Sequence, residues 1–225
     1  MITKQVRRVR ATWPGVVAGI LLLGTMAAVG AAAIRGSDTV ANAATSNNSP
    51  LTEDDLFQDP NSPGLGNPKG AVTVVEFFDY RCPYCRIMEP RLQELLAQDQ
   101  SVRLVLKDWP IFGGMSVYAA QVAIAAGWQG KYAPVHGALF TLPRTMDRDA
   151  VRNAARKAGV DLAQLDRDLS ARSAEIDRIL GKTDVEARTL QLQGTPGFVI
   201  GHNLVPGALS LDDLEHLVAN AKDKK

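Results

Sequence analysis

The feature that most restricts the possible folds of this chain is a pair of cysteines two residues apart, Cys82 and Cys85, and the chain has no others. Shortly before the pair, residues 72–78 (VTVVEFF) form an apolar, β-branched and aromatic run that is typical of a buried strand. Apolar residues at helical spacing then continue to about residue 97, and Pro83 suits the first position of a helix, where no N–H is needed. A disulfide within so small a loop would stabilise the fold very little, which indicates a bond that opens and closes.

The expected position of the cysteines predicts an asymmetric pair of thiols. The first turn of a helix has free N–H groups and the positive end of the helix dipole, so the pKa of Cys82 should fall below that of a free thiol. Arg81 and Arg86 add positive charge nearby. We therefore expect Cys82 to be an exposed nucleophile and Cys85, one turn along, to be the resolving thiol that faces the protein.

Two other interpretations of the pair deserve comparison with redox catalysis. Cys-x-x-Cys pairs often hold zinc, but a structural zinc site needs four ligands, and the three histidines (His136, His202 and His216) are scattered. The second is an inert disulfide, as in a peptide-binding chaperone whose cysteines are incidental. The strand–cysteine–helix context favours a thiol enzyme, for which we expect no cofactor and no metal.

The pattern after the cysteines indicates an α/β fold. Residues 102–106 (VRLVL) predict a second strand, and a right-handed crossover through the cysteine helix would place it parallel to the first. A block of helices is expected over residues 116–190. Within it, Thr183-x-x-Glu186 predicts a capping box that begins the last helix of the block.

A short hairpin and a terminal helix should complete the sheet. Residues 198–200 predict a strand, and residues 204–205 should pair back onto it after a turn. Ser210-x-x-Asp213 predicts the cap of a final amphipathic helix.

The start of the chain has the pattern of an export signal. A basic stretch precedes an uncharged apolar run at residues 13–34, and Ala41-Asn42-Ala43 fits a cleavage site. Residues 1–43 are therefore expected to be a signal peptide or an N-terminal membrane anchor, since the run could span a bilayer. Without them the net charge falls from +1 to −3, which does not favour binding to nucleic acid. Residues 44–70, rich in Asn, Ser, Pro and Gly, predict a linker and N-terminal extension.

Two motifs together resemble those of the DsbA-like disulfide oxidoreductases of bacterial envelopes. They are the residues 76–85 (EFFDYRCPYC) and the residues 194–201 (GTPGFVIG). The resemblance implies a thioredoxin-like fold over residues 71–222, with an inserted helical domain at about 114–190. It also implies that Pro196 is cis and faces Cys82, and that the backbone of Thr195 is offered to an extended substrate peptide.

The resemblance also assigns roles to two polar residues of the predicted strands. It implies that Glu76 is a buried acid beneath the disulfide, with a raised pKa, that relays the proton of Cys85. Lys107 is similar to the lysine that pairs with this acid in the family. The alternative is an ordinary polar pair at strand ends, but a Glu inside a buried strand is costly unless it is paired.

The direction of the reaction remains open at this stage. The dithiol oxidases of the family carry a His between their cysteines, where this chain has Pro83-Tyr84, and Thr195 resembles the corresponding residue of the isomerases and reductases. Those isomerases have an N-terminal dimerisation domain, for which residues 44–70 are too short, so we expect a monomer. The resemblance implies cysteine-containing exported proteins and a membrane redox partner as partners. It implies a location in the periplasm or on the extracytoplasmic face of the inner membrane.

Overall fold

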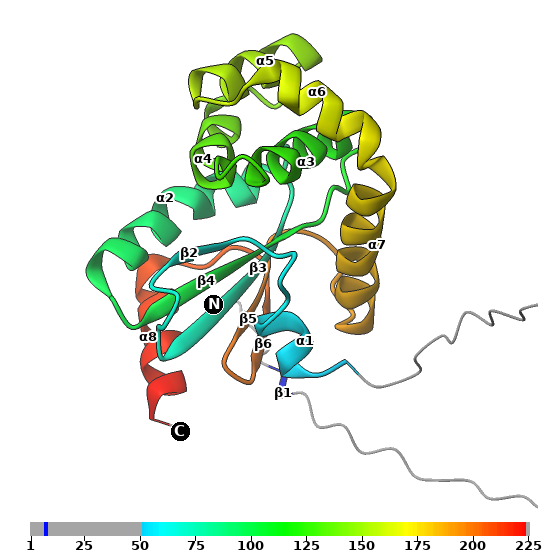
Figure 1. The fold of residues 1–225 in the computed structure, drawn as a ribbon. Helices are drawn as coiled ribbons and strands as arrows, with labels where there is room; N and C mark the ends of the chain where they lie inside the picture. The colour runs from blue at the N-terminus through cyan, green and yellow to red at the C-terminus, as the bar shows by residue number, and fades with distance from the viewer. Residues whose placement is uncertain (1–6, 9–50, 224–225) are drawn as a thin grey trace, which may run out of the picture. The chain divides into compact units, whose positions relative to one another are not determined.

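A computed structural model describes residues 7–8 and 51–223 of the chain, and a mixed sheet lies at its centre (Figure 1). The strand order is β1-β6-β5-β3-β4-β2. The strands are β1 (Arg7–Arg8), β2 (Gly64–Gly66), β3 (Val72–Phe78), β4 (Val102–Asp108), β5 (Gly197–Ile200) and β6 (Asn203–Pro206). The helices are α1 (Glu53–Phe57), α2 (Pro83–Gln98), α3 (Gly114–Gly127), α4 (Tyr132–Thr141), α5 (Arg148–Lys157), α6 (Leu162–Ala171), α7 (Ser173–Thr189) and α8 (Leu211–Lys222). The predicted leader lies outside the described residues, apart from β1.

The central strands have the predicted directions. β3 and β4 are parallel, because α2 carries the chain from the end of one to the start of the other. β5 and β6 form the predicted hairpin, and β5 runs antiparallel to β3. Ser210 caps α8 and accepts from the Asp213 N–H, as the capping box requires. The short strand β2, which pairs with β4, was not predicted, since Gly64–Gly66 has no alternating pattern.

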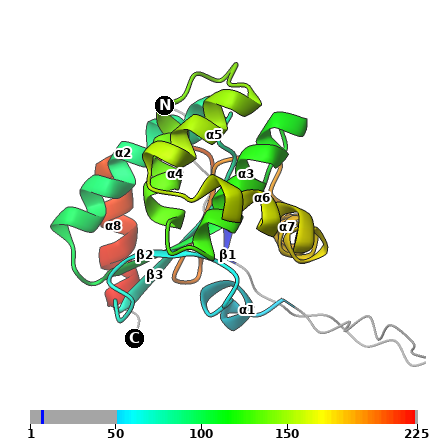
Figure 2. The same ribbon diagram turned by 45° about the horizontal axis from the view of Figure 1, so that its top comes forward.

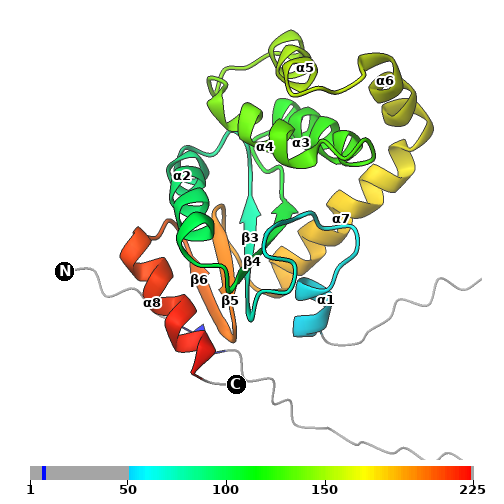
Figure 3. The same cartoon turned by 60° about the vertical axis from the view of Figure 1, so that its left-hand side comes forward.

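The two faces of the sheet have separate hydrophobic cores. Val74 and Phe78 of β3 pack with α2 and α8 on one face, while Val75 and Phe77 pack on the other face with residues of α1 and α7. Figure 3 shows the two pairs of helices on opposite sides of the strands. Because side chains alternate along a strand, each residue of β3 is committed to one of these cores.

A block of five helices, α3 to α7, is inserted between β4 and β5, which confirms the predicted thioredoxin-like fold with a helical insertion. Figures 1 and 3 show α3 to α6 grouped beyond the end of the sheet at which β3 and β4 terminate, and in Figure 2 the same helices are turned to the front. α3 is apolar on nearly all sides and is almost wholly buried, so it forms the centre of the block. None of the helices in residues 51–223 is long and apolar enough to cross a membrane.

The predicted capping box at Thr183 and Glu186 is wrong, because α7 runs without a break from Ser173 to Thr189. Both side chains are buried in the middle of this helix. Residues three apart are neighbours on one face of a helix, so a Thr followed three residues later by a Glu occurs on the buried face of a helix as well as in a capping box.

The buried face of α7 contributes to a compact cluster of charges. Lys107 on β4 has its Nζ 2.8 Å from Oδ2 of Asp59 and 2.8 Å from Oε2 of Glu186. Lys182 lies 3.0 Å from the same oxygen of Asp59. Burial opposes ionisation of Asp59, but hydrogen bonds from Lys107, the Asn61 N–H and Lys182 outweigh it and hold the pKa of Asp59 below its usual value. The cluster joins the segment after α1 to β4 and α7.

We expect Lys107→Met to lower the free energy of unfolding by about 3–5 kcal/mol, because it leaves two carboxylates in a buried site without their central cation. Lys182→Met is the matched control. Its side chain is 39% exposed, so the loss should be at most about 1 kcal/mol. Urea unfolding at neutral pH measures both, and equal losses for the two variants would contradict the assignment.

Candidate active site

Cys82 and Cys85 lie where the sequence predicts, between β3 and α2. Cys82 is the N-cap of α2 and Pro83 is its first residue. Both cysteines are free thiols, so this is the dithiol form of the pair. Their side chains are buried, with 1% of Cys82 and 0% of Cys85 exposed. The expectation that Cys82 is exposed is therefore wrong for this form of the protein.

The residue that covers Cys82 comes from the other end of the chain. The Thr195–Pro196 peptide bond is cis, as the resemblance implies. The thiol of Cys82 donates a hydrogen bond to the carbonyl oxygen of Thr195, with 3.2 Å between the two atoms. Burial of the reduced thiol follows from this contact between the start of α2 and the loop before β5. The Thr195 hydroxyl is buried with no hydrogen-bond partner in the thiol form, so it is available to a thiolate.

The two thiols have very different acidities. The pKa of Cys82 is lowered to about 6, first by a hydrogen bond from the Cys85 thiol and then by Thr195 and the N–H groups of Cys85 and Tyr84, against the effect of burial. Burial raises the pKa of Cys85 far above its ordinary value, and its hydrogen bond to Cys82 and the charge of Glu76 add to the rise. At neutral pH the pair therefore holds one proton, on Cys85, and one thiolate, on Cys82.

Glu76 shares the layer between the sheet and α2 with Cys85. It lies on the same face of β3 as Val74 and Phe78, where α2 packs, and is almost completely buried. Burial raises its pKa well above the usual value, and the charges of Glu89 and Cys82 raise it further. Both effects favour the protonated acid, and Oε1 of Glu76 has no hydrogen-bond partner.

The structure does not place Lys107 beside Glu76. Glu76 is in register with Leu106 of β4, and Lys107 is in register with Phe77. Successive side chains point to opposite faces of a sheet, so Lys107 lies on the α7 face with Asp59. The family-like role for Lys107 as the partner of Glu76 has no support in this geometry.

A buried chain of polar side chains that the sequence did not reveal lies beside Glu76. Glu89 of α2 is 3.1 Å from Nε2 of His136, and Nδ1 of His136 is 3.1 Å from the hydroxyl of Tyr80. Burial opposes ionisation of Glu89, but His136 outweighs it and lowers the pKa of Glu89. The only sequence signal was the four-residue interval between Cys85 and Glu89, which places both on one helical face.

Asp79 is a second residue that sequence reasoning missed. Its Oδ1 accepts hydrogen bonds from the Arg81 N–H at 2.7 Å and the Ser116 hydroxyl at 2.8 Å. Its Oδ2 accepts from the N–H groups of Ile111 and Phe112, at 2.7 and 3.0 Å. One buried carboxylate thus holds the turn before Cys82, the loop after β4 and the start of α3 together. An acid directly after a buried strand was the available signal.

Exposed apolar side chains surround the cysteines. Five large hydrophobic side chains are exposed in the described residues, and four of them flank this site: Tyr84, Ile87, Ile111 and Phe112. Tyr84 and Ile87 lie in the first turns of α2, and the other two lie in the loop that Asp79 holds. Such a cluster is typical of a surface that binds a polypeptide.

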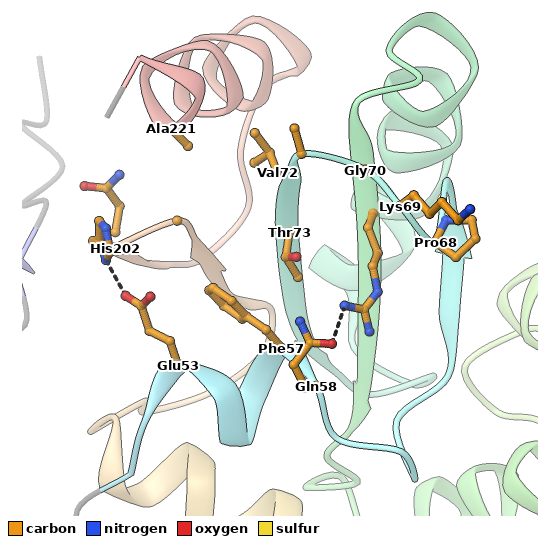
Figure 4. A pocket seen from close by; sticks show the side chains of 14 residues that line it. Glu53, Phe57, Gln58, Pro68, Lys69, Gly70, Val72, Thr73, His202 and Ala221 are labelled. Carbon is orange, nitrogen blue, oxygen red and sulfur yellow. Dashed lines mark hydrogen bonds and ion pairs between the residues drawn. The ribbon is translucent and has the colours of Figure 1, made fainter. Parts of the chain in front are cut away.

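A hollow elsewhere on the molecule has no part in this chemistry. Figure 4 shows it lined by Glu53, Thr73 and His202, among others, close to where β3 begins at Val72. β3 is seven residues long, so the hollow lies roughly 20 Å from its other end, where Cys82 follows. Over residues 51–223, no three His, Cys, Asp or Glu side chains are grouped as metal ligands.

Solved structures resemble this chain over most of its length. A thioredoxin-like oxidoreductase from Silicibacter pomeroyi DSS-3 has a TM-score of 0.74 and 43% sequence identity, covering 77% of this chain and 99% of its own. The catalytic domain of Proteus mirabilis ScsC has a TM-score of 0.69 and 27% identity, covering 76% of this chain and 94% of its own. The thiol-disulfide exchange protein alpha-DsbA2 from Wolbachia pipientis has a TM-score of 0.71 and 25% identity, covering 74% of this chain and 90% of its own.

Curated relatives include proteins of two kinds. The Na(+)/H(+) antiporter NhaA 1 of Salinispora arenicola is 30% identical over 167 residues, which are 72% of this chain and 25% of the antiporter. The chain thus spans about a quarter of the length of the antiporters it matches. The thiol:disulfide interchange protein DsbA of Bordetella pertussis is 27% identical over 151 residues, which are 63% of this chain and 68% of DsbA.

The match to a protein family covers both motifs and the helical insertion between them. Residues 73–219 match the family described as a DSBA-like thioredoxin domain. This range includes the cysteine pair, the cis-proline loop and Glu76. The chain belongs to the DSBA-like thioredoxin-domain family, and it is a thiol–disulfide oxidoreductase whose active site is the Cys82–Cys85 pair.

Proposed function

We propose that this enzyme donates disulfides to cysteine-containing exported proteins outside the cytoplasm. The observation that carries the direction is the difference in acidity between Cys82, with a pKa of about 6, and Cys85, with a pKa far above the ordinary value. A stabilised Cys82 thiolate favours the reduced enzyme, and this makes its disulfide more oxidising.

The proposed reaction begins with the disulfide form. A substrate thiolate attacks Sγ of Cys82, the Cys82–Cys85 bond breaks, and Cys85 leaves. Because Cys85 is a weak acid, its departure requires a proton. Glu76, whose raised pKa favours the protonated acid, supplies it from the same layer. A second substrate thiolate then attacks the mixed disulfide and expels Cys82, a good leaving group because of its low pKa. Two electrons pass from the substrate dithiol to the enzyme, and a membrane redox partner would remove them.

Isomerisation or reduction is the second candidate direction, and Thr195 favours it by resemblance to the isomerase branch. The location outside the cytoplasm rests on the leader-like pattern of residues 1–43 and on neighbours such as a periplasmic thioredoxin-like protein from Salmonella. We also propose that the enzyme acts as a monomer.

The direction is tested by the equilibrium of the purified protein with a glutathione buffer and by refolding assays. We expect the disulfide form to oxidise a reduced substrate protein efficiently and to rearrange a scrambled one slowly. Cys82→Ser should abolish turnover, and Cys85→Ser should accumulate mixed disulfides because the resolving thiol is missing. Turnover by Cys82→Ser would refute the assignment, and rapid rearrangement with a strongly reducing potential would favour the isomerase direction.

The acidity of Cys82 gives a second prediction. Alkylation of Cys82 in the reduced protein should be half-maximal near pH 6 and should reach a plateau by neutral pH. In Cys85→Ala the midpoint should move towards the ordinary value of 9.0, because the hydrogen bond that lowers the pKa most is lost. Because the pKa of Cys82 is about 6 in the folded protein and 9.0 for an ordinary thiol, the free energy of unfolding of the reduced protein should rise as the pH increases from about 6 to 9. The disulfide form has no thiol at this position and should not show this rise. Equal midpoints in both proteins would contradict this account.

A third prediction concerns Glu76. Glu76→Gln should slow the reaction of the disulfide form with a thiol peptide about 100-fold, because Cys85 must then leave without an internal acid. The wild-type rate at a fixed thiolate concentration should fall as the pH rises through the raised pKa of Glu76, whereas the variant should lack this fall. Glu94→Gln, on the exposed side of α2, is the matched control. Stopped-flow measurements that give the same pH profile for Glu76→Gln and wild type would rule out the proton transfer.

A further inference from the structure

Two arginines bind each other's backbone at one edge of the active site. Nε of Arg81 donates to the carbonyl oxygen of Arg144 at 2.9 Å, and Nε of Arg144 donates to the carbonyl oxygen of Arg81 at 2.8 Å. Nη1 of Arg81 also donates to the carbonyl oxygen of Phe112 at 2.7 Å. The Arg81 carbonyl belongs to the peptide bond that joins Arg81 to Cys82. The helical insertion therefore places an exposed guanidinium, that of Arg144, next to the backbone of the nucleophile.

A third arginine lies behind these two. Arg86 of α2 donates through Nη2 to the carbonyl oxygen of Tyr80 at 2.8 Å and through Nη1 to the carbonyl oxygens of Phe140, at 2.6 Å, and Leu142. Burial lowers the pKa of Arg86, and the charge of Arg144 lowers it further. We call Arg81, Arg86 and Arg144 the arginine edge.

The partners of the arginine edge are backbone carbonyls. Within residues 51–223, the side-chain hydrogen bonds of its three members go to backbone carbonyls, and no carboxylate oxygen lies within 4.0 Å of them in an ion pair. Arg152, Arg172 and Arg188 instead have carboxylate partners, which are Asp166, Glu175 and Asp184. Arg91, which bonds the carbonyl oxygen of Leu209, and Arg167, which bonds Gln164, resemble the arginine edge in having no ion-paired carboxylate. The charges of Asp79 and Cys82 act on Arg86 at the inner side of the edge. Arg144 is exposed and has no ion-paired carboxylate among the described residues, so its guanidinium can take an external anion.

The surroundings indicate what kind of anion would reach the edge. Phe112 and Ile111, which are exposed, lie beside it, and Cys82 lies at its margin. A polypeptide that presents a cysteine to Cys82 would cover these apolar side chains and carry its neighbouring residues over Arg144. A free inorganic anion would gain nothing from the apolar side chains.

We propose that the arginine edge binds an acidic side chain next to the reacting cysteine of the substrate polypeptide, with Arg144 as its main contact. This inference rests on the proposed function and adds a preference among substrates. The pair would be partly exposed, so its contribution should be a two- to fivefold change in rate, about that of a surface ion pair. Salt should weaken the preference, because exposed charges are screened.

The test uses the full chain in its disulfide form and three thiol peptides that differ only in the residue beside cysteine, which is Glu, Gln or Lys. The quantity measured is the ratio of the second-order rate constants for the Glu and Lys peptides, corrected for the thiolate fraction of each peptide. This ratio should be about two to five for wild type and should approach one at high salt. It should approach one in Arg144→Gln and fall below one in Arg144→Glu.

Arg167→Gln is the matched control, since Arg167 is an exposed arginine of α6 whose guanidinium bonds Gln164. Its ratio should equal that of wild type, and circular dichroism checks that every variant is folded. Equal rates for the three peptides with wild type would overturn the arginine-edge proposal while leaving disulfide donation intact. Failure to react with any peptide would instead refute the proposed function. An unchanged ratio in a folded Arg144→Glu variant would show that another group sets the preference.

Discussion

The chemistry of this protein depends on the stabilisation of one thiolate at the start of a helix. Cys82 caps α2, where free N–H groups lie, and hydrogen bonds from the side chains of Cys85 and Thr195 lower its pKa. Cys85, only one turn away, is buried and keeps its proton. The two sulfurs thus differ in leaving ability although they belong to one disulfide. A parallel β-α-β unit produces this difference, since it brings the helix start to the end of a buried strand and leaves no room for water around the second sulfur.

Alternation along β3 and β4 separates two kinds of buried charge. Glu76 faces α2, where burial raises its pKa and the charges of Glu89 and Cys82 raise it further. Lys107 faces α7, where Asp59 and Glu186 neutralise it. A cation on the face of Glu76 would lower the pKa of this acid and so favour the form that cannot provide a proton to Cys85. A shift of β4 by one residue along β3 would place Lys107 on the face of Glu76, so the register of these two strands decides whether the buried acid can serve the redox pair.

The helical insertion contributes to the active site as well as to the core. Ser116 and the loop before α3 hold Asp79, and Asp79 holds the turn that leads to Cys82. The ends of α4 receive the guanidinium of Arg86 from α2. His136 of α4 pairs with Glu89, whose charge raises the pKa of Glu76. These contacts explain why the insertion lies at the end of the sheet where the cysteines are, and they allow it to present Arg144 to a bound polypeptide.

The sequence alone determined the order of the central strands and of the helices that follow them, and the position of the cysteine pair, because hydrophobic periodicity is a local property. The N-cap position predicts Cys82 as the nucleophile on the same local basis. It also pointed, through resemblance, to the cis Pro196 and to the buried Glu76. Tertiary structure alone decided the partner of Lys107, the burial of Cys82 beneath Thr195, and the roles of Asp79, Glu89 and His136. It also showed that Thr183 and Glu186 belong to the middle of α7. Each of these depends on contacts between segments far apart in the chain, or on which face of an element a side chain occupies, and a local pattern of residue types does not specify either.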